Sequence, residues 1–447
     1  MSKTGYRKIA DQMADDIQAG RLKPGEQLLP QREFAYQRGI AQSTASRVYL
    51  ALSRKGLVTG EVGRGTYVRS SAAPIGAIAL SEPASAPIDL ELNFPILSGQ
   101  ADMIARSLKG VMIPDNLATA LRPLGSKPAR STRQTIASFL KRGGWAPEPD
   151  LVFATGNGRQ AIAASLSALA PPGSRIGVEA LTYPVILGIA EQLRLDLVPL
   201  ELDREGIVPA KLADSHRAAP LKAVYFQTYL HNPLGVSMGN ARRAELAAVL
   251  KDTNLPAVED AIYSFLVDDP PLALLAPDQV ILVDSLSKRI APGLTLGMIV
   301  APPQFGSEIA RAIRSGAWSP SGFALSGALQ LMSDGTAGRL QLEKRGDAKK
   351  RQKIARSTLA EIELSGDHRA YHILMHLPES WRAEEFVAAA EKLGVSTVSA
   401  RAFAVSAGYA PNSVRLALAS PTESELISAL SILREIAIAG PSRKDVG

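Results

Sequence analysis

Short apolar runs alternate with helical stretches through the middle of this 447-residue chain. Helical stretches such as 160–169 and 241–252 lie between several of these runs. This alternation predicts an α/β fold, in which a mostly parallel sheet is wrapped by helices. The candidate strands are 151–153, 175–178, 196–200, 223–226, 257–259 and 280–283.

Length and composition bound the class of protein. The chain is long enough for two or three domains, and 46% of its residues are hydrophobic, which supports a large buried core. It has no run of 18 uncharged apolar residues and starts without the apolar segment of a secretory signal. We therefore expect a cytoplasmic protein with no membrane span. The absence of cysteine excludes disulfides and cysteine-ligated metals, and the five scattered histidines predict no metal site.

Positive charge is concentrated at the N-terminal end. Residues 1–70 contain 12 Lys and Arg against 6 Asp and Glu, a net charge of +6. The whole chain has a net charge of +7, so the rest of it is close to neutral. A small basic module beside a neutral body favours binding of a polyanion by the module, although a solvated charged surface would show the same balance.

Three helices followed by a hairpin are predicted within this basic region. Ile9, Met13 and Ile17 recur every four residues, which gives the first helix one apolar face. Residues 31–38 form a second, short helix, and Ser43-Thr44 is expected to cap a third. Two β-prone runs then surround a cluster of glycines, which predicts a hairpin. Together these elements make a winged helix-turn-helix.

Four local motifs occur in the same region in a fixed order. They are Pro24-Gly25, Arg32, Ser43-Thr44-Ala45-Ser46-Arg47 and Gly63-Arg64-Gly65-Thr66-Tyr67-Val68. The region resembles the GntR-type DNA-binding domain, in which a Pro-Gly pair, a second-helix arginine, a Ser/Thr-rich recognition helix and a glycine-rich wing follow one another. Two positions depart from that pattern. Leu29 replaces the usual proline, and Gln42 stands where many members have a basic residue.

The resemblance implies contacts with double-stranded operator DNA, made by the recognition helix in the major groove. Gln42, Ser43 and Arg47 are candidate base readers, because glutamine can pair with adenine and arginine with guanine. Arg32 and Arg64 are candidate phosphate contacts, with Arg64 at the tip of the wing. The complete set of DNA-binding candidates is Arg32, Gln42, Ser43, Thr44, Arg47 and Arg64.

A linker separates this module from the body of the chain. Residues 70–87 are rich in proline, alanine and serine and have little to bury. We therefore expect a DNA-binding domain over 1–69 and a body over 88–447. A smaller C-terminal α+β subdomain is expected from about residue 325.

Lys288 follows the apolar run 280–283 in the segment Asp284-Ser285-Leu286-Ser287-Lys288-Arg289. A buried strand, small hydroxyls and one lysine suggest an amine delivered beside a phosphate pocket. Asp260 ends another short apolar run, and Asn232-Pro233 follows a third. The order Asn-Pro, Asp and Ser-x-Ser-Lys resembles the pyridoxal-phosphate (PLP) pocket of fold-type I aminotransferases.

The resemblance implies a role toward PLP for each residue of this pocket. Lys288 would form the Schiff base, which needs an amine with a depressed pKa. Asp260 would pair with the pyridine N1–H and hold the ring as an electron sink. Asn232 and Tyr263 would reach the O3′ oxygen, and Tyr183 would stack on the ring.

The phosphate group of PLP would bind at a glycine-rich turn, 155–160, where a strand ends and a helix begins. Thr295 occupies the position at which the family normally has a phosphate-binding arginine. Either Arg289 substitutes for that arginine or the phosphate is held more weakly. The candidates for phosphate binding are Gly158, Arg159, Ser285, Ser287 and Arg289.

Arg415, in Asn412-Ser413-Val414-Arg415-Leu416, resembles the arginine that grips a substrate carboxylate in these enzymes. A guanidinium binds a carboxylate through two parallel hydrogen bonds. A surface arginine on a strand is the alternative. By contrast, the segment 88–120 matches the usual start of such a body only loosely.

The whole chain resembles the MocR subfamily of GntR regulators, in which a winged helix is fused to an aminotransferase-like body. The resemblance implies a homodimer that binds DNA and senses PLP, or an amino acid or amine, through Lys288. A catalytically active aminotransferase with an appended DNA-binding domain is the alternative. The resemblance implies no physiological turnover, while residual aminotransferase-type chemistry stays open. A regulator whose pocket has lost its cofactor is disfavoured by Lys288, Asp260 and Asn232.

Overall fold

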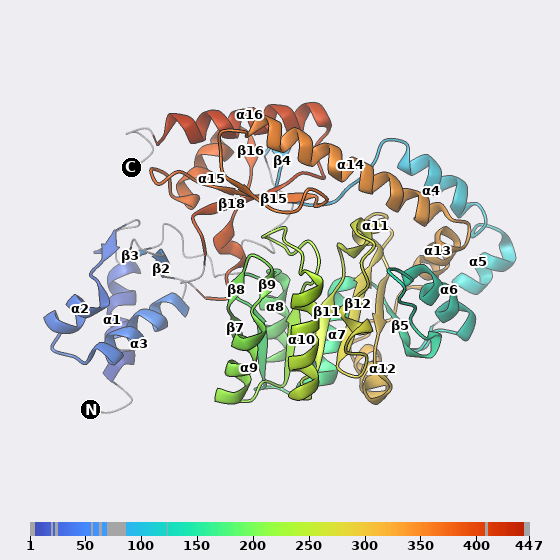
Figure 1. Cartoon of the computed structure of the whole chain (residues 1–447), viewed down its shortest axis with the longest axis horizontal. Coiled ribbons are helices and arrows are strands. Elements are labelled where there is room, and N and C mark those ends of the chain that lie inside the picture. The colour runs from blue at the N-terminus through green and yellow to red at the C-terminus, as the bar shows by residue number, and fades with distance from the viewer. Residues whose placement is uncertain are drawn as a thin grey trace.

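The computed structural model divides into a small N-terminal unit and a large body (Figure 1). None of the described helices is both long and apolar enough to cross a membrane. The described residues are 5–18, 21–22, 26–54, 57–61, 65–68, 86–122, 124–406 and 410–441.

The N-terminal unit is the expected winged helix, with three helices and a three-stranded sheet in the order β1-β3-β2. Phe34 and Val48 are buried in its small core. The third helix begins at Gln42, so Ser43 and Thr44 lie in its first turn and the expectation that they precede it as caps is corrected. The elements are α1 Gly5–Gln18, β1 Gln27–Leu28, α2 Gln31–Gln37, α3 Gln42–Arg54, β2 Val58–Glu61 and β3 Gly65–Val68.

The wing touches the body. Strands β2 and β3 pair antiparallel, which confirms the hairpin. The guanidinium of Arg382, at the start of α15 (Ala383–Lys392), lies 4.1 Å from the ring centroid of Tyr67 on β3. Three sequence features fall outside the described residues: Pro24-Gly25, Gly63-Arg64 and most of the linker, 70–85.

The body is built on a seven-stranded sheet in the order β5-β13-β12-β11-β10-β6-β7. All six expected strands are present. A seventh, β13, inserts antiparallel between β12 and β5 and was not expected. The strands are β5 Val152–Thr155, β6 Arg175–Glu179, β7 Asp196–Leu200, β10 Ala223–Phe226, β11 Ala257–Asp260, β12 Val280–Ser285 and β13 Gly297–Val300.

Helices cover both faces of this sheet, because successive side chains of a strand point to opposite sides. Val224 and Phe226 face one hydrophobic core, which also takes side chains from α6, α9, α10 and α13. Ala223 and Tyr225 face the other, with α7, α8 and α12. The helices are α6 Arg130–Leu140, α7 Gly158–Leu169, α8 Val185–Leu193, α9 Pro209–Ala218, α10 Asn240–Asp252, α12 Gly306–Ser315 and α13 Gly322–Ser333.

A second, four-stranded sheet and two helices form the C-terminal part of the body, drawn above the large sheet in Figure 1. The segment after the linker also joins it, because β4 pairs with β16 and Leu90 enters its core. Its elements are β4 Ile88–Asp89, β14 Leu364–Ser365, β15 His372–His376, α15, β16 Val395–Ser396, β17 Val398–Ser399, β18 Ser413–Ala417 and α16 Glu423–Ala439.

The long helix α14 (Thr336–Thr358) connects the two parts of the body. Leu325 and Leu340 pack in the core of the large part, whereas Ala355 packs in the core of the C-terminal part. The chain therefore passes from one core to the other within α14, later than the expected position near residue 325. The remaining elements are α4 Gln100–Leu108, α5 Pro114–Ala120, β8 Leu202–Asp203, β9 Gly206–Ile207 and α11 Leu286–Arg289.

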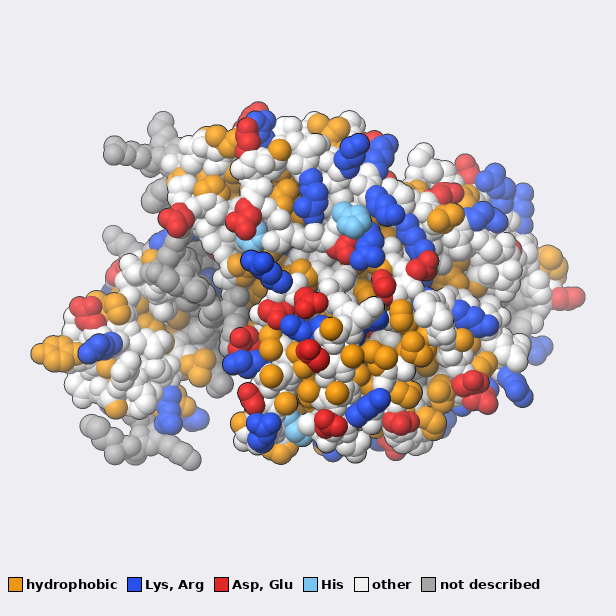
Figure 2. All heavy atoms as spheres, viewed as in Figure 1, with side chains coloured by type: hydrophobic (Ala, Val, Ile, Leu, Met, Phe, Trp, Pro, Cys, Tyr) orange, Lys and Arg blue, Asp and Glu red, His pale blue; other side chains and the backbone are white. Residues whose placement is uncertain are grey.

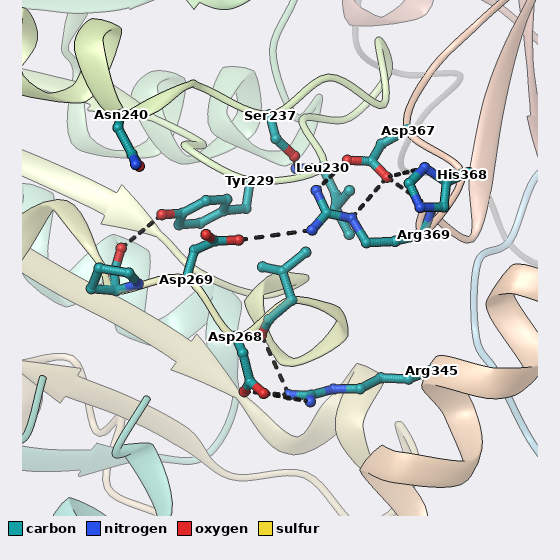
Figure 3. Close-up of polar contacts among 12 residues, drawn as sticks. Tyr229, Leu230, Ser237, Asn240, Asp268, Asp269, Arg345, Asp367, His368 and Arg369 are labelled. Atoms are coloured by element: carbon teal, nitrogen blue, oxygen red, sulfur yellow. Dashed lines mark hydrogen bonds and ion pairs between the residues drawn. The ribbon is translucent and has the colours of Figure 1, made fainter. Parts of the chain in front are cut away.

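Charged contacts join the two parts along this helix (Figure 3). Arg345 on α14 contacts Asp268 of the large part, with Nη2 and Oδ1 3.0 Å apart. Arg369, between β14 and β15, pairs with Asp367 and lies 3.8 Å from Asp269. Over the face shown in Figure 2, acidic and basic side chains are interspersed on the body.

Candidate functional site

A cavity of about 360 Å³ lies at the carboxyl ends of β11 and β12, between the large sheet and the C-terminal part. Such edges of open α/β sheets are the usual place for ligands. Nine of the residues expected to surround PLP or its partner line this cavity together. They are Gly158, Arg159, Tyr183, Asn232, Asp260, Tyr263, Ser287, Lys288 and Arg415.

Lys288 lies on the short helix α11, directly after β12, and its amine reaches the cavity. Its Nζ donates a hydrogen bond to the carbonyl oxygen of Asn93 at 2.6 Å and lies 3.5 Å from the centroid of the Phe94 ring. Burial holds the pKa of this amine well below its ordinary value, and the nearby positive charges of Arg415 and Arg159 lower the pKa further. A neutral amine is the nucleophilic form of lysine.

Asp260 ends β11 and is buried. Its Oδ2 accepts hydrogen bonds from the Tyr225 hydroxyl at 2.7 Å and from Gln227 Nε2 at 3.1 Å. Burial raises the pKa of its carboxyl to about 6, although these hydrogen bonds favour the charged form. The carboxylate is therefore fixed in direction and ready to pair with a cationic group of a ligand.

The start of α7 and the start of α11 meet at one end of the cavity. A Cβ added to Gly158 would lie 3.0 Å from the Cβ of Ser285, so this close approach favours glycine. The Ser285 hydroxyl accepts from the Ser287 amide at 3.2 Å and lies 3.1 Å from the Thr295 hydroxyl. Ser287 and Thr295 line the cavity, whereas Ser285 does not line it and contacts both of them through its hydroxyl.

Arg159 and Arg289 lie in different surroundings. The Arg159 side chain lines the cavity and hydrogen bonds to Tyr183, which counteracts the effect of burial on the pKa of that tyrosine. Arg289 is not among the residues that line it. Its buried guanidinium pairs with Asp284 and Gln341 and packs against the Phe265 ring. Successive side chains of a helix point in different directions. Because Lys288 points into the cavity, the next side chain, Arg289, points away from it.

Of the two alternatives for the missing phosphate-binding arginine, the geometry disfavours substitution by Arg289. The guanidinium of Arg289 already has a carboxylate partner, and moving it would leave the Asp284 carboxylate buried beside the more distant Arg142, at 3.8 Å. Removing such a partner is costly inside a protein. The positive charge at this end of the cavity comes from Arg159.

Arg415 on β18 reaches the cavity from the C-terminal part. Its Nη2 donates to the carbonyl oxygen of Glu91 at 2.7 Å, and its guanidinium lies 5.2 Å from the Phe403 ring centroid. Among the described residues its buried Nε has no hydrogen-bond partner. Buried polar groups are normally paired, so this guanidinium is suited to an anionic group of a ligand.

Several cavity residues were not expected from the sequence. Asn93 and Phe94 lie between β4 and α4, and Gln227 follows β10. Asn93 Nδ2 also donates to the hydroxyl of Tyr263 at 3.1 Å. Asn93-Phe94-Pro95 matched the usual start of such a body only loosely, so no role in the site was expected of Asn93 or Phe94. Their proximity to Lys288 arises because β4 pairs with the distant strand β16.

The winged helix presents a second group of candidates. Gln42, Ser43 and Arg47 are exposed on α3, and Arg32 is exposed on α2. Thr44 is half-buried. Several of the predicted DNA contacts are therefore exposed to solvent in the first half of the recognition helix α3. Across the described ranges, no group of three or more histidine, aspartate or glutamate side chains is arranged to hold a metal ion.

Comparison with known proteins assigns both units. Residues 124–433 match the family described as "Aminotransferase class I and II". Residues 5–68 match "Bacterial regulatory proteins, gntR family". The described fold agrees with both assignments, since a winged helix precedes a helix-covered, mostly parallel sheet.

Relatives share this combination over most of their length. The chain is 29% identical over 440 residues to "Uncharacterized HTH-type transcriptional regulator YdeF" of Bacillus subtilis, covering 96% of this chain and 94% of the relative. It is 25% identical to "HTH-type pyridoxine biosynthesis transcriptional regulator PdxR" of Corynebacterium glutamicum, covering 79% of each.

A solved structure shares the fold of the body. Pyrococcus horikoshii kynurenine aminotransferase superposes with a TM-score of 0.72 at 24% identity, covering 79% of this chain and 91% of that one. The chain therefore belongs to the class I and II aminotransferase family and carries a gntR-type domain in front of it, the combination that defines the MocR subfamily of GntR regulators.

Proposed function

We propose that this protein is a DNA-binding transcriptional regulator whose body binds PLP and senses PLP or an amino compound through Lys288. The observation that carries the proposal is the fusion of an exposed recognition helix to a cavity that is lined by the half-buried Lys288. An enzyme needs no winged helix, and a simple DNA-binding protein needs no such cavity. The domain limits that we propose are 1–69, a linker over 70–87, and 88–447.

The residues that line the cavity fit PLP. Asp260 offers a carboxylate to the pyridine nitrogen, and Lys288 offers an amine of lowered pKa to the aldehyde. The buried Oδ1 atom of Asn232 has no hydrogen-bond partner among the described residues. Buried polar atoms are normally paired, so this oxygen is suited to a polar group of a ligand. Bound PLP would supply an aldehyde that condenses with amines and a ring that withdraws electrons.

The phosphate group would lie where α7 and α11 begin. Gly158 begins α7, and the backbone amides in the first turn of a helix favour an anion. Ser287 and Thr295 supply hydroxyls, and Arg159 supplies the positive charge. This set compensates for the arginine that the family normally has at the position of Thr295.

The effector that we propose carries a primary amine and a carboxylate. Its amine would compete with Lys288 for the aldehyde, and its carboxylate would bind Arg415. A ligand shifts the protein between two arrangements only through different affinities for them, so effector binding and DNA binding must affect each other reciprocally. The relative named for regulation of pyridoxine biosynthesis supports PLP itself as the second candidate signal.

A homodimer is part of the proposal, because two DNA-binding heads read two half-sites. Exposed apolar side chains around α5 support it. Leu121 is 73% exposed, Met112 58%, Ile113 53% and Phe323 40%. Exposed apolar patches of this kind mark protein interfaces. Light scattering at micromolar concentration checks the assembly, and a monomer there would contradict it.

The experiment that tests the proposed function combines spectroscopy with an assay of turnover. Purified protein mixed with PLP should gain visible absorbance, and borohydride should fix the cofactor to the peptide that contains Lys288. A Lys288→Ala variant should show neither effect. Amino-acid panels should change the spectrum without sustained transamination. Steady multiple turnover would instead favour the second candidate function, an aminotransferase that carries a DNA-binding domain, for which the intact Lys288 and Asp260 are the favouring observation.

A further inference from the structure

A second lysine contacts the backbone at Lys288 but does not line the cavity. Lys344 on α14 is fully buried, although lysine is among the residues least often found inside proteins. No acidic side chain forms an ion pair with it among the described residues. A buried ammonium without an ion pair needs other hydrogen-bond acceptors.

Those acceptors are backbone carbonyl groups at the end of α11. Lys344 Nζ donates to the carbonyl oxygen of Lys288 at 3.1 Å and to that of Ile290 at 2.7 Å. Gln100 Nε2 also donates to Ile290 at 2.9 Å. The last carbonyl groups of a helix lack partners within the helix, and a cation is favoured there. Lys344 therefore holds the turn from which the Lys288 side chain departs.

Lys344 itself is held in place by neighbours on both parts of the body. The Tyr371 hydroxyl donates to the carbonyl oxygen of Lys344 at 2.9 Å. The next residue, Arg345, donates through Nε to the carbonyl oxygen of Phe265 at 2.6 Å and pairs with Asp268 (Figure 3). A rigid α14 thus fixes Lys344, and Lys344 fixes the backbone of Lys288.

The two lysines also interact through charge. Burial lowers the pKa of Lys344 to about 7, while Asp347 acts in the opposite direction. The positive charge of Lys344 lowers the pKa of Lys288, after the larger effects of burial, Arg415 and Arg159, and Asp260 opposes these effects. Removal of Lys344 should therefore make the Lys288 amine easier to protonate.

We propose that Lys344 is a positioning residue for Lys288, which clamps the carbonyl groups of Lys288 and Ile290 and so directs the Lys288 amine into the cavity. This role rests on the proposed function for the purpose of the amine, and on the described contacts for its geometry. Lys344 touches the backbone of Lys288 and does not line the cavity.

Competitive labelling tests this role without any bound cofactor. The full-length protein is freed of carbonyl compounds with hydroxylamine and then labelled with acetic anhydride across a range of pH. Mass spectrometry of the Lys288 peptide gives the midpoint and the plateau of its reactivity. In Lys344→Met the midpoint should rise, because a neighbouring positive charge is lost. On the rising limb, a rise of about one pH unit lowers the rate about tenfold.

The plateau separates position from charge. At high pH the Lys288 amine is neutral in every variant, so a lower plateau in Lys344→Met reports a misdirected amine. Lys344→Gln keeps an N–H donor without the charge, and should recover part of the plateau while its midpoint stays high. Lys349→Met removes an exposed lysine from the same helix and should match the wild-type protein.

An unchanged plateau in folded Lys344→Met would overturn the positioning role, even if the midpoint rises through the loss of charge alone. If that variant does not fold, Lys344→Gln decides by the same two quantities. The wild-type spectrum with PLP is recorded separately. If the wild-type protein gains no visible absorbance with PLP but the Lys344 variants show the expected changes in labelling, the proposed function alone is contradicted. The opposite pattern would contradict the positioning role alone.

Discussion

The cavity and the recognition face of the winged helix are organised in opposite ways. In the cavity, Asp260 is buried, Lys288 is half-buried, and both already bind neighbours, at 2.7 Å to Tyr225 and 2.6 Å to Asn93. On α3, Gln42 and Arg47 are exposed to solvent. The charge states of the cavity groups are therefore set by the protein, whereas the contacts of the recognition helix are set by the DNA that it meets.

The two units are therefore suited to different tasks, the cavity to a small ligand and α3 to DNA. A preformed site selects a small ligand, because fixed dipoles and charges admit one arrangement of polar groups. An exposed basic surface gains affinity from phosphate contacts and specificity from a few side chains at base edges. Substitutions in the cavity should therefore act first on stability and ligand binding, and those on α3 should act first on DNA binding.

The largest expected effect is on stability, at Arg289. Arg289→Ala should lower the free energy of unfolding by roughly 3–5 kcal/mol, because it leaves Asp284 buried without its close partner. Arg434→Ala is the control, since its pair with Glu361 is exposed and worth less than about 1 kcal/mol. Denaturant titration measures both. Similar losses of unfolding free energy for the two variants would contradict the importance of the buried pair between Arg289 and Asp284.

Acid should destabilise the cavity region through His372. Its ring is buried beside Tyr263, and burial lowers its pKa to about 3. The folded state therefore binds this proton less tightly than the unfolded chain, whose histidine has a pKa of about 6.5. The stability that depends on neutral His372 is complete above about pH 6.5 and is lost progressively as the pH falls toward 3.

The measurement is the free energy of unfolding between pH 7 and pH 4. Between pH 7 and pH 4 the His372→Gln variant should lose a few kcal/mol less of its unfolding free energy than the wild-type protein. His368→Gln, at a ring that is 73% exposed, should leave the decline unchanged. Parallel curves for wild type and His372→Gln would show that this histidine is not protected from protonation.

Arg159 should determine the affinity for the anionic end of the cofactor. Arg159→Ala should weaken PLP binding by about 1.5–3 kcal/mol, the value of a hydrogen bond to a charged group, while stability changes little. Affinity for pyridoxal, which lacks the phosphate, should fall much less. Titration of the visible absorbance with each compound gives both constants. An equal loss for the two compounds would place the phosphate elsewhere.

The smallest effects are expected on the recognition face, and they differ in kind. Arg47→Ala should cost about 1–3 kcal/mol of preference for operator over random DNA, as a base reader. Arg32→Ala should weaken both DNAs similarly and reduce the salt slope by about one, as a phosphate contact; the same is expected of Arg64→Ala. Binding measured at several salt concentrations separates the two outcomes, and identical behaviour of the variants would refute the assigned roles.

Much of this organisation could be predicted from local sequence patterns. The helices of the winged helix follow from periodicity, and six of the seven strands of the large sheet follow from short apolar runs. The apolar run before Lys288 and the resemblance to the aminotransferase pocket together indicate its place in the site. The inserted strand β13 could not be predicted, because its short run Gly297–Val300 resembles many buried segments. The sequence also could not show that Arg289 points away from the cavity, because the orientation of the short helix α11 depends on tertiary packing.

Contacts between distant segments were also beyond local patterns. Asn93 lies 195 positions before Lys288 and reaches it only because β4 pairs with β16. Lys344 belongs to a long polar helix, and its sequence neighbours Glu343 and Arg345 are partly or fully exposed. Lys344 shares the buried face of α14 with Leu340 and Ala348, and its contact with α11 depends on how the two helices pack. Residues that act through backbone carbonyl groups leave no recognisable motif.

The most direct test of the account is whether the cavity controls the recognition face. Operator affinity is measured for the wild-type protein and for Lys288→Ala, each alone, with PLP, and with PLP plus a panel of amines and amino acids. We predict that at least one of these additions changes the operator affinity of the wild-type protein and that Lys288→Ala does not respond. Wild-type protein that binds PLP at Lys288 while its operator affinity stays constant under every addition would contradict the account.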